Sequence, residues 1–506
     1  MELQLKQGRR DYKVESTQVV SEGVVLRNSI RGTHQPRFTK GAETTAREHT
    51  SRIRLSSLKL LGNHVPSSMI FLALAELAVC FFSALLVLEP PHMPSALLFS
   101  FAALVGMGSM GLYHRRMKLG LIRIALQTLL AFAVVAVFFV VMYFIRPSSL
   151  LYGWNLLSAT TLACGGVLLL RTMYVGLRTH EKHKQRVLVI GCGQQAQALT
   201  CMSRHEQRGF TIVAFLRVNG EKGVRDRARV IRHDRPLVEI ARIYDIDEMV
   251  VAVDDRRNKL PMDQILDCRM SGIRVSDLPT FYERETGKIM LEMASASWLI
   301  FNDGFHRGPL WAACKRFIDI TASVTLLLLF LPIMLLISAA LFLESRGRHR
   351  VLYKQVRVGL NGRLFKIVKF RSMRPDAEAD GVARWATADD QRITRVGGFI
   401  RRTRLDELPQ LFNVLKGEMS LVGPRPERPE FAEKLAASLP YYKDRCRVKP
   451  GVTGWAQICF HYGASERDAF HKLQYDLYYM KNSTWLLDLI ILLQTVEIVL
   501  WGKGSR

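Results

Sequence analysis

The sequence has no arrangement of cysteines that could form a disulfide framework or bind a structural metal. Its 506 residues include only eight cysteines, and none of them belongs to a CxxC pair or to a cluster of cysteines and histidines. Disulfide-rich secreted domains and zinc sites depend on such spacings. The sequence therefore excludes both classes and predicts soluble parts that fold in a reducing cytoplasm.

Acidic residues are scarce relative to basic ones. The chain has 45 Asp and Glu residues against 71 Lys and Arg residues, which gives a formal net charge of +26. Such an excess favours nucleic acid, an anionic membrane surface or a phosphate-rich substrate as the partner. Because long apolar runs are flanked by basic stretches, we expect a membrane and phosphates rather than nucleic acid.

The N-terminal segment lacks the apolar core of a signal peptide. About the first 60 residues are polar and basic, whereas a secretory signal contains an apolar stretch of about 7–15 residues. We therefore expect residues 1–65 to form a disordered basic arm in the cytoplasm.

Charged residues are almost absent from four long apolar runs that follow this arm. Each run approaches the roughly 20 residues that a helix needs to cross a bilayer. The loop at residues 90–95 contains no Lys or Arg, whereas the loops at 114–123 and 178–186 are basic. Basic loops stay in the cytoplasm, so residues 66–178 are predicted to form four transmembrane helices with both ends inside. The runs cover residues 68–88, 95–112, 121–144 and 150–175.

A pattern typical of dinucleotide-binding domains comes next. Residues 186–190 have the composition of a buried strand, and the segment from Gly191 to Ala196, Gly-Cys-Gly-Gln-Gln-Ala, matches the turn that lets a backbone approach a pyrophosphate. Arg217 stands where an acidic residue would bind a ribose hydroxyl, which leaves a 2′-phosphate or no dinucleotide. Residues 183–300 are predicted to form a Rossmann-like, CoA-binding-like α/β domain. Its further strands are expected at residues 211–216, 248–253 and 273–276.

This α/β domain also lacks a catalytic pair. Membrane-anchored nucleotide-sugar dehydratases share the layout and need a Tyr-x-x-x-Lys acid/base pair, but Tyr244 is followed four residues later by Glu248, and Tyr282 by Thr286. We therefore expect a structural or regulatory domain. The dehydratase remains one alternative function, and a catalytically inactive membrane scaffold is another.

A fifth apolar run, at residues 320–343, has basic residues on both sides. Lys315 and Arg316 precede it, and arginines follow at 346, 348 and 350, so both ends favour the cytoplasm. Pro332 in its centre removes a helical hydrogen bond and kinks a helix. These features predict a re-entrant helix-break-helix hairpin over residues 313–345, bent at Pro332. A straight span is the alternative, and it would place the rest of the chain outside.

Two adjacent carboxylates, Asp406 and Glu407, stand in a strongly basic stretch near the end of the chain. Pro409 fits only the first turn of a helix, so the pair is expected at a helix N-terminus, whose N–H groups favour anions. Arginines at 401, 402 and 404 should keep the carboxylates ionised. An ionised carboxylate can attack phosphorus or bind Mg²⁺.

Arg425 lies between Pro424 and Pro426, whose fixed φ angles make the loop rigid. A guanidinium held in one direction suits an oxyanion whose charge shifts during phosphoryl transfer. Taken alone, each of these motifs would more often be structural. Their combination beside a membrane hairpin favours phosphoryl-transfer chemistry.

Six motifs in this region follow one another in a fixed order. With them, residues 311–506 resemble the catalytic domain of the polyprenyl-phosphate sugar-1-phosphate transferases, also called bacterial sugar transferases. The whole layout resembles the large members that initiate exopolysaccharide, capsule or O-antigen synthesis: a four-helix transmembrane bundle, a Rossmann-like α/β domain, and an α/β-irregular catalytic domain on a re-entrant anchor. The motifs are KRFID (315–319), KFRSM (369–373), DQRITRVG (390–397), RRTRLDELPQ (401–410), VGPRPE (422–427) and KPGVTGWAQ (449–457).

The resemblance implies roles for particular residues. In the family, the Asp of the Asp-Glu pair attacks the β-phosphate of a UDP-sugar, contacts Mg²⁺ and releases UMP. Asp406 would then be the nucleophile and a metal ligand, Glu407 a supporting acid, and Arg425 a phosphate clamp. Two positions depart from the family: Leu331 precedes Pro332 where many members have Ser, and Val356 stands where an acid is common. The residues expected to bind substrate are Lys315, Arg316, Asp319, Lys369, Arg371, Arg401, Arg425, Glu427, Lys449 and Gln457.

The resemblance also implies the partners and the location. The substrates would be a UDP-sugar and undecaprenyl phosphate, with UDP-glucose expected first, galactose next and an N-acetylated sugar third. The protein is expected in the bacterial inner membrane, as a multi-pass protein whose catalytic domain faces the cytoplasm. The sequence leaves open whether the protein forms a homo-oligomer.

Overall fold

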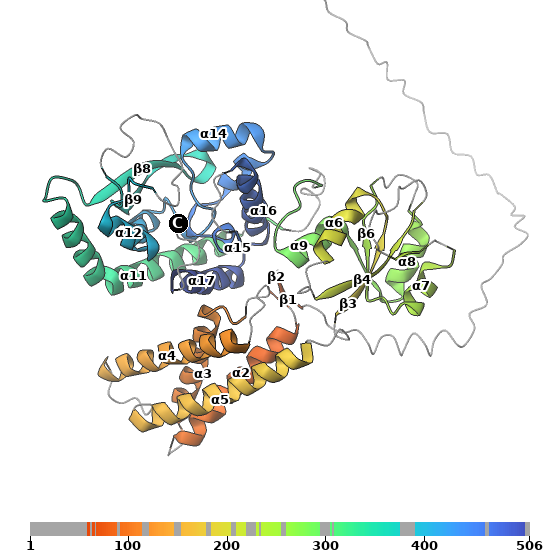
Figure 1. Ribbon diagram of the computed structural model, residues 1–506, viewed down its shortest axis with the longest axis horizontal. Helices are drawn as coiled ribbons and strands as arrows, with labels where there is room; N and C mark the ends of the chain where they lie inside the picture. Colours follow the sequence, from red (N-terminus) through yellow and green to blue (C-terminus); the bar gives the residue numbers. More distant parts are fainter. Residues whose placement is uncertain are drawn as a thin grey trace, which may run out of the picture. The chain divides into compact units, whose positions relative to one another are not determined.

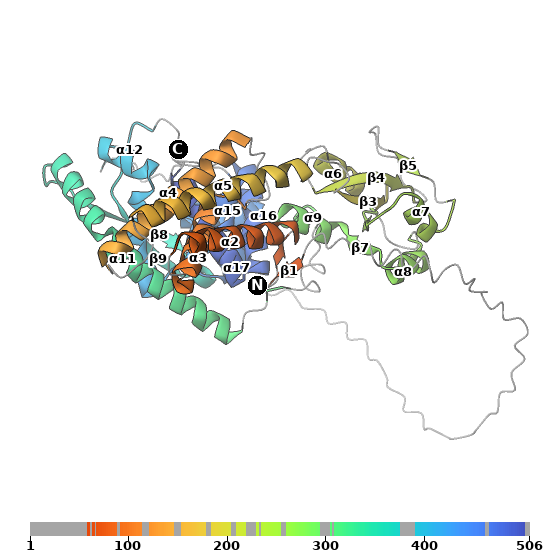
Figure 2. The ribbon, with the colours of Figure 1, turned by 90° about the horizontal axis from the view of Figure 1, so that it is seen from below.

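The structure of the chain is a computed structural model, shown in Figures 1 and 2. It describes residues 58–60, 63–65, 67–88, 92–113, 121–145, 153–178, 184–203, 209–218, 229–231, 234–254, 260–293, 304–305, 308–374, 390–460 and 465–500. Within the segment predicted as a disordered arm, β1 (Leu58–Leu60) pairs with β2 (Asn63–Val65) in an antiparallel ladder. The prediction for residues 1–57 lies outside the described residues.

Four apolar helices form where the sequence predicts transmembrane segments. Small and aromatic side chains pack between them, while large apolar side chains such as Phe71 and Phe144 stay exposed, which suits a lipid environment. Three of the helices are long enough to span a bilayer, whereas the second has 17 residues and lies at the short end of that range. The helices are α2 (Ser67–Val87), α3 (Met93–Ser109), α4 (Leu121–Ile145) and α5 (Gly153–Arg178).

The helix bundle encloses an ion pair between α2 and α5. Arg171 Nε lies 2.8 Å from Glu76 Oε1, Arg171 Nη2 donates to Glu76 Oε2 at 2.9 Å, and the Tyr113 hydroxyl also donates to Glu76. Both charged side chains are buried. An unpaired charge at this depth would be costly, so the pair fixes how α2 and α5 pack.

A five-stranded parallel sheet follows, with the order β5-β4-β3-β6-β7. Leu188 and Ile190 point toward one face and Val187 and Val189 toward the other, so the buried first strand has helices on both faces. Helices α7 and α8 cover one face, and α6 and α9 cover the other. The predicted α/β domain is thus present, and its Rossmann-like character stays a prediction. Its elements are β3 (Gln185–Ile190), α6 (Gln194–Ser203), β4 (Phe210–Leu216), β5 (Val230–Ile231), α7 (Leu237–Ile243), β6 (Glu248–Val251), α8 (Met262–Met270), β7 (Arg274–Asp277) and α9 (Leu278–Thr286).

The glycine-rich turn between β3 and α6 contacts a carboxylate of its own chain. Asp254 Oδ2 accepts the N–H of Gln194, and Asp254 Oδ1 accepts the N–H of Gln195, both at 2.9 Å. A Cβ at Gly193 would lie 2.0 Å from Asp254 Oδ2, so only glycine lets the carboxylate approach this closely. The start of α6 therefore has an internal anion at the place where a pyrophosphate would bind.

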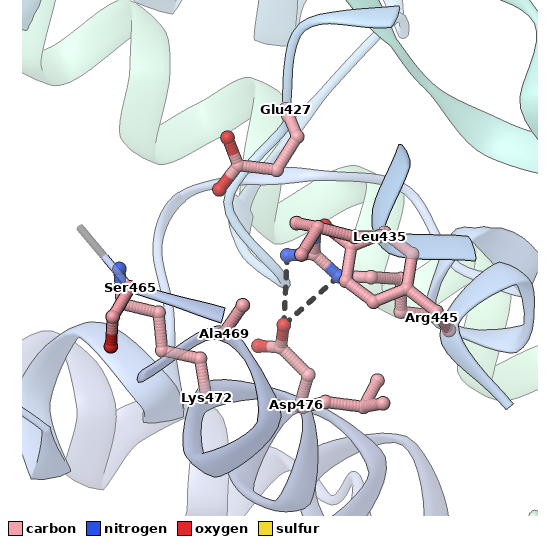
Figure 3. Close-up of a pocket in the computed structure, with 9 residues that line it drawn as sticks. Glu427, Leu435, Arg445, Ser465, Ala469, Lys472 and Asp476 are labelled. Atoms are coloured by element: carbon pink, nitrogen blue, oxygen red, sulfur yellow. Dashed lines mark hydrogen bonds and ion pairs between the residues drawn. The ribbon is translucent and has the colours of Figure 1, made fainter. Parts of the chain in front are cut away.

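The remaining elements form the domain that carries the charged motifs. A β-hairpin, β8 with β9, and a short parallel pair, β10 with β11, are surrounded by helices. A buried ion pair links η4 to α16, since Arg445 Nη2 lies 2.8 Å from Asp476 Oδ2 (Figure 3). The elements are α11 (Pro309–Glu344), β8 (Leu352–Val358), η2 (Leu360–Gly362), β9 (Leu364–Phe370), α12 (Arg395–Arg402), η3 (Leu405–Gln410), α13 (Leu411–Lys416), β10 (Ser420–Val422), α14 (Pro429–Ser438), η4 (Tyr442–Arg447), β11 (Gly451–Thr453), α15 (Trp455–Cys459), α16 (Glu466–Asn482) and α17 (Trp485–Leu500).

Helix α11 is apolar and continues through Pro332. Its 36 residues would extend over roughly 54 Å at 1.5 Å per residue, far more than the roughly 30 Å of a bilayer core. Both views show it bent along its length (Figures 1 and 2), as expected where proline removes a helical hydrogen bond. Leu328, Leu329 and Leu336 are more than 60% exposed, at 69%, 65% and 71%. The re-entrant topology stays a prediction.

The segment after α9 packs against α16. Ile289 and Leu291 are buried in one cluster with Leu473, Leu477 and other apolar residues. The Ile289 N–H donates to the Gln474 carbonyl at 3.1 Å. Residues that the sequence groups with the α/β domain therefore complete an apolar core around α16.

Candidate active site

The two adjacent carboxylates lie in the first turn of η3, as the sequence predicts from Pro409. Asp406 and Glu407 are its second and third residues. Arg404, just before them, has a φ of 57°, in the left-handed region that a non-glycine residue rarely adopts. Such a conformation costs about 1–3 kcal/mol and is frequent at functional sites.

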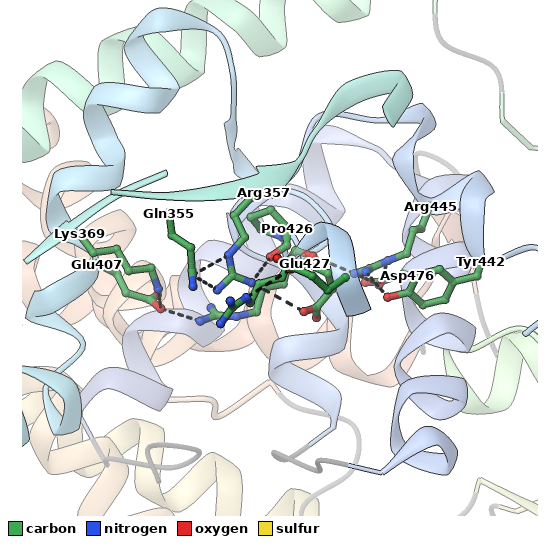
Figure 4. A network of polar contacts seen from close by, with 12 residues as sticks. Gln355, Arg357, Lys369, Glu407, Pro426, Glu427, Tyr442, Arg445 and Asp476 are labelled. Carbon is green, nitrogen blue, oxygen red and sulfur yellow. Dashed lines mark hydrogen bonds and ion pairs between the residues drawn. The ribbon is translucent and has the colours of Figure 1, made fainter. Parts of the chain in front are cut away.

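Glu407 is buried and bound by two cations (Figure 4). Its Oε1 accepts from Arg425 Nη2 at 2.9 Å and from Lys369 Nζ at 3.0 Å, and Arg404 Nη1 lies 3.9 Å from its Oε2. Burial alone would raise the pKa of Glu407, but the charges of Arg425, Lys369 and Arg404 outweigh it and hold the pKa well below its usual value. Glu407 is therefore ionised at neutral pH.

Asp406 has a different environment. None of the residues that the structure describes forms a hydrogen bond or ion pair with its carboxylate. Burial and the neighbouring charge of Glu407 raise the pKa of Asp406 to about 6, although Lys369, Arg401 and Arg425 act in the opposite direction. At neutral pH this carboxylate is mostly ionised, desolvated and open to an electrophile, which are the properties of a nucleophile.

The structure thus brings together five of the predicted residues from three elements and a loop. Lys369 comes from the end of β9, Arg401 from the last turn of α12, the two carboxylates from η3, and Arg425 from the loop after β10. Burial lowers the pKa of Lys369 and Arg425 lowers it further, while Glu407 offsets part of the effect. The carboxylate pair therefore sits among cations that can bind phosphate groups.

The part of the chain that carries this site is similar in sequence to known proteins. A family model described as bacterial sugar transferase matches residues 310–502. A UDP-glucose:undecaprenyl-phosphate glucose-1-phosphate transferase of Xanthomonas campestris pv. campestris is 32% identical over 347 residues, which cover 67% of this chain and 71% of the relative. The chain belongs to the bacterial sugar transferase family. The relationship predicted from the six motifs is confirmed.

Other relatives are named for other sugars. A UDP-N-acetylgalactosamine-undecaprenyl-phosphate N-acetylgalactosaminephosphotransferase of Aeromonas hydrophila is 41% identical over 239 residues, 47% of this chain and 55% of the relative. An undecaprenyl-phosphate galactose phosphotransferase of Salmonella typhimurium is 30% identical over 343 residues, 64% of this chain and 69% of the relative. The chain spans about half the length of the Aeromonas relative that it matches.

Three predicted substrate-binding residues of this family member attach α11 to the domain. Lys315 Nζ lies 2.6 Å from Asp488 Oδ2 on α17. Arg316 donates to the last carbonyls of α13, those of residues 414 and 415, at 2.5 and 2.6 Å. Asp319 is buried and accepts the Leu421 N–H at 3.0 Å. These contacts are structural, and a role in substrate binding stays a prediction.

The other predicted residues lie outside the carboxylate pair's contacts. Arg371 donates to the Arg350 carbonyl at 2.9 Å, and Gln457 donates to the Val452 carbonyl at 3.3 Å. Burial lowers the pKa of Lys449, and the neighbouring charge of Arg316 lowers it further. Glu427 Oε2 lies 3.8 Å from Arg357 Nη1. Their roles toward substrate also stay predictions.

The carboxylate pair fits a magnesium ion shared with substrate. Mg²⁺ usually binds one or two carboxylates together with waters and substrate phosphates. Asp406 offers a carboxylate without a protein partner among the described residues, and Glu407 lies beside it. Within those residues no group of three His, Cys, Asp or Glu side chains could hold a metal. That Asp406 holds such an ion stays a prediction.

Three polar residues around the pair were not predicted as site residues. Arg357 comes directly after Val356, one of the two positions that depart from the family pattern, so the sequence did contain a signal close to it. Arg445 stands between the last two motifs, and Asp476 follows the last one. Nothing in a single sequence indicates that η4 and α16 pack together so that Arg445, paired with Asp476, contacts the Arg425 carbonyl.

Proposed function

We propose that this protein transfers a sugar-1-phosphate from a UDP-sugar to undecaprenyl phosphate and releases UMP, through a covalent phosphosugar intermediate on Asp406. The observation that carries the proposal is the asymmetry of the carboxylate pair. Glu407 is neutralised by Arg425 and Lys369, whereas Asp406 has no such partner among the described residues and has a pKa of about 6. The names of the relatives support the reaction.

In the first step an Asp406 oxygen attacks the β-phosphorus of the UDP-sugar. The bond from that phosphorus to the bridging oxygen breaks, and UMP leaves with the electron pair. Arg425, Lys369 and Arg401 lie where they can stabilise the charge that builds up on the phosphoryl oxygens. Glu407 keeps two of these cations in place. Mg²⁺, when bound, would neutralise further charge on the diphosphate.

In the second step the phosphate of undecaprenyl phosphate attacks the phosphorus held on Asp406. The acyl-phosphate bond breaks, Asp406 regains its carboxylate, and the lipid carries a diphosphate-linked sugar. Because the two substrates react in turn at one carboxylate, the mechanism is ping-pong. Such a reaction is the first membrane step in building a lipid-linked polysaccharide.

The sugar is proposed by analogy. The relatives named above act on glucose, N-acetylgalactosamine or galactose, so the family resemblance fixes the lipid and the leaving group better than the sugar. UDP-glucose is the first choice, followed by UDP-galactose and then an N-acetylated UDP-sugar. A panel of these donors, compared by kcat/KM for UMP release, distinguishes them.

The catalytic domain is proposed to face the cytoplasm at the inner membrane, where UDP-sugars are made, with α11 entering and leaving the inner leaflet at a bend near Pro332. Labelling of single cysteines with a membrane-impermeant reagent tests this topology. A cysteine placed near Lys449 should be protected in intact cells and labelled in inverted vesicles. Labelling in intact cells would overturn the re-entrant arrangement.

Detection of the covalent intermediate tests the reaction itself. Membranes containing the protein should release UMP from the UDP-sugar and retain radioactivity on the protein when the β-phosphate carries ³²P. Asp444→Asn serves as a matched control, because Asp444 lies on η4 and pairs with the exposed Arg447. Absence of UMP release from the wild-type protein with every donor, in the presence of undecaprenyl phosphate and Mg²⁺, would exclude the proposed function.

A further inference from the structure

The loop that carries Arg425 has few main-chain donors of its own. Pro424 and Pro426 lack an N–H group, so the position of the loop depends on what its carbonyl groups accept. Four successive carbonyls, from Pro424 to Glu427, each accept a hydrogen bond from another part of the domain. The donors are Gly451 N at 2.9 Å, Arg445 Nη2 at 2.9 Å, Arg357 Nη1 at 3.1 Å and Val358 N at 2.9 Å, in that order.

The bond to the carbonyl of Arg425 itself comes from a buried arginine. Arg445 Nη2 is also the atom nearest to Asp476, at 2.8 Å, and Arg445 Nε donates to the same carboxylate oxygen at 3.1 Å. Arg445 Nη1 donates to the Tyr442 hydroxyl at 3.0 Å. Figure 3 shows the guanidinium beside Asp476, and Figure 4 shows Arg445 and Asp476 in the same polar network as Pro426 of the loop.

Burying this ion pair is costly, which argues that it does more than fill space. Arg445 and Asp476 are 8% and 2% exposed, and a buried pair is often no more stabilising than apolar side chains of the same volume. The pair fixes the orientation of the planar guanidinium, because Asp476 binds both Nε and Nη2. In this orientation Nη2 also donates to the Arg425 carbonyl.

We propose that Arg445, oriented by Asp476, is a positioning residue for Arg425. By holding the main-chain carbonyl of Arg425, it fixes where the Arg425 guanidinium meets Glu407 and the incoming phosphate groups. The inference rests on the proposed function. Its physical basis is that a displacement of about 1 Å at a group that stabilises a transition state can lower the rate by about 100-fold.

The expected consequence is a loss in kcat that depends on Arg425. Arg445→Lys replaces the guanidinium with a single ammonium group. This group cannot bind Asp476 and donate to the Arg425 carbonyl in the same geometry. The variant should lower kcat for UMP release by about 10- to 100-fold, with a smaller change in KM for the UDP-sugar. Asp476→Asn should act in the same direction with a smaller loss, because the amide can still accept one bond from Arg445.

A double-mutant cycle tests whether the effect passes through Arg425. In the background of Arg425→Lys, the further change Arg445→Lys should alter kcat by less than about twofold, since there is no longer a guanidinium to position. Each rate is divided by the amount of active enzyme, measured as the burst of UMP in a single turnover. If Arg445→Lys does not fold, Asp476→Asn takes its place in the cycle.

Arg447→Gln is the matched control. Arg447 lies two residues from Arg445 on η4, but its side chain is 75% exposed and pairs only with Asp444 among the described residues. Its loss should leave kcat unchanged. Equal losses from Arg445→Lys in the wild-type and Arg425→Lys backgrounds would overturn the positioning role while leaving the proposed function intact. A wild-type protein without UMP release would instead remove the proposed function.

Discussion

Two helix starts in this protein each have a carboxylate, and the two sites differ in how its charge is satisfied. In the α/β domain, Asp254 accepts two N–H groups at the start of α6. In the transferase domain, η3 carries its own carboxylates, and side-chain cations surround them while Asp406 lacks a partner among the described residues. At the first site Asp254 already occupies the position of an anion, so we call it the closed site. At the second site the surrounding cations can still bind phosphate groups, so we call it the open site.

The largest expected effect comes from removing the Asp406 carboxylate of the open site. Asp406→Asn keeps the size of the side chain but removes its negative charge, so UMP release should fall by at least about 1,000-fold and ³²P labelling should disappear. Glu407→Gln should also lower kcat, without the two losses adding. Steady-state UMP release with equal amounts of folded protein measures both. Near wild-type turnover in Asp406→Asn would show that another group is the nucleophile.

Deleting the α/β domain, which contains the closed site, tests whether the transferase domain is independent of it. The sequence predicts that a chain starting near Trp311 works alone. The contacts of Ile289 and Leu291 indicate a longer unit, because burying each such side chain stabilises by about 1.5–3 kcal/mol. A chain starting at Asp277 should therefore melt at a higher temperature and retain more UMP release than one starting at Gly308. Equal melting temperatures and activities would show that the segment is dispensable.

The pH dependence of the transferase site should reflect Asp406. The nucleophile must be ionised, and burial next to Glu407 raises its pKa to about 6. Hence kcat/KM is highest above pH 6 and should fall about tenfold per pH unit below it, as the carboxylate becomes protonated. The pKa of Glu407 is held well below its usual value, so Glu407 does not titrate in this range. A flat profile down to pH 5 at saturating Mg²⁺ would contradict the assignment.

The smallest effect is expected at the closed site. Asp254→Ala leaves two N–H groups at the start of α6 without their acceptor, and loss of a capping carboxylate costs about 0.5–2 kcal/mol. The melting temperature should fall slightly while kcat/KM for the UDP-sugar stays within about twofold. A phosphate-dependent rise in the melting temperature of the variant alone would show that Asp254 occupies an anion site. A large loss of turnover would instead link the α/β domain to catalysis.

Local patterns predicted the open site better than the closed one. The place of the carboxylate pair followed from Pro409, and the rigidity of the Arg425 loop from its two prolines. For the α/β domain, the sequence indicates the turn at Gly191, but Arg217 stands where an acid would follow the second strand. Asp254 comes after β6, which lies beside β3 in the sheet, so its contact depends on strand order. Arg445 and Asp476 are 31 residues apart, and their pairing follows from the packing of η4 on α16.

The segment between α9 and α11 has a consequence for synthesis of the protein on the ribosome. Glu292 and its partner Gln474 are 182 residues apart, and Ile289 and Leu291 pack on the same stretch of α16. At about 5–20 residues per second, these apolar side chains emerge roughly 10–40 s before α16 exists. During that interval Ile289 and Leu291 have no α16 to pack against. A ribosome that stalls between these points would leave a nascent chain with exposed apolar surface, which chaperones bind and which aggregates.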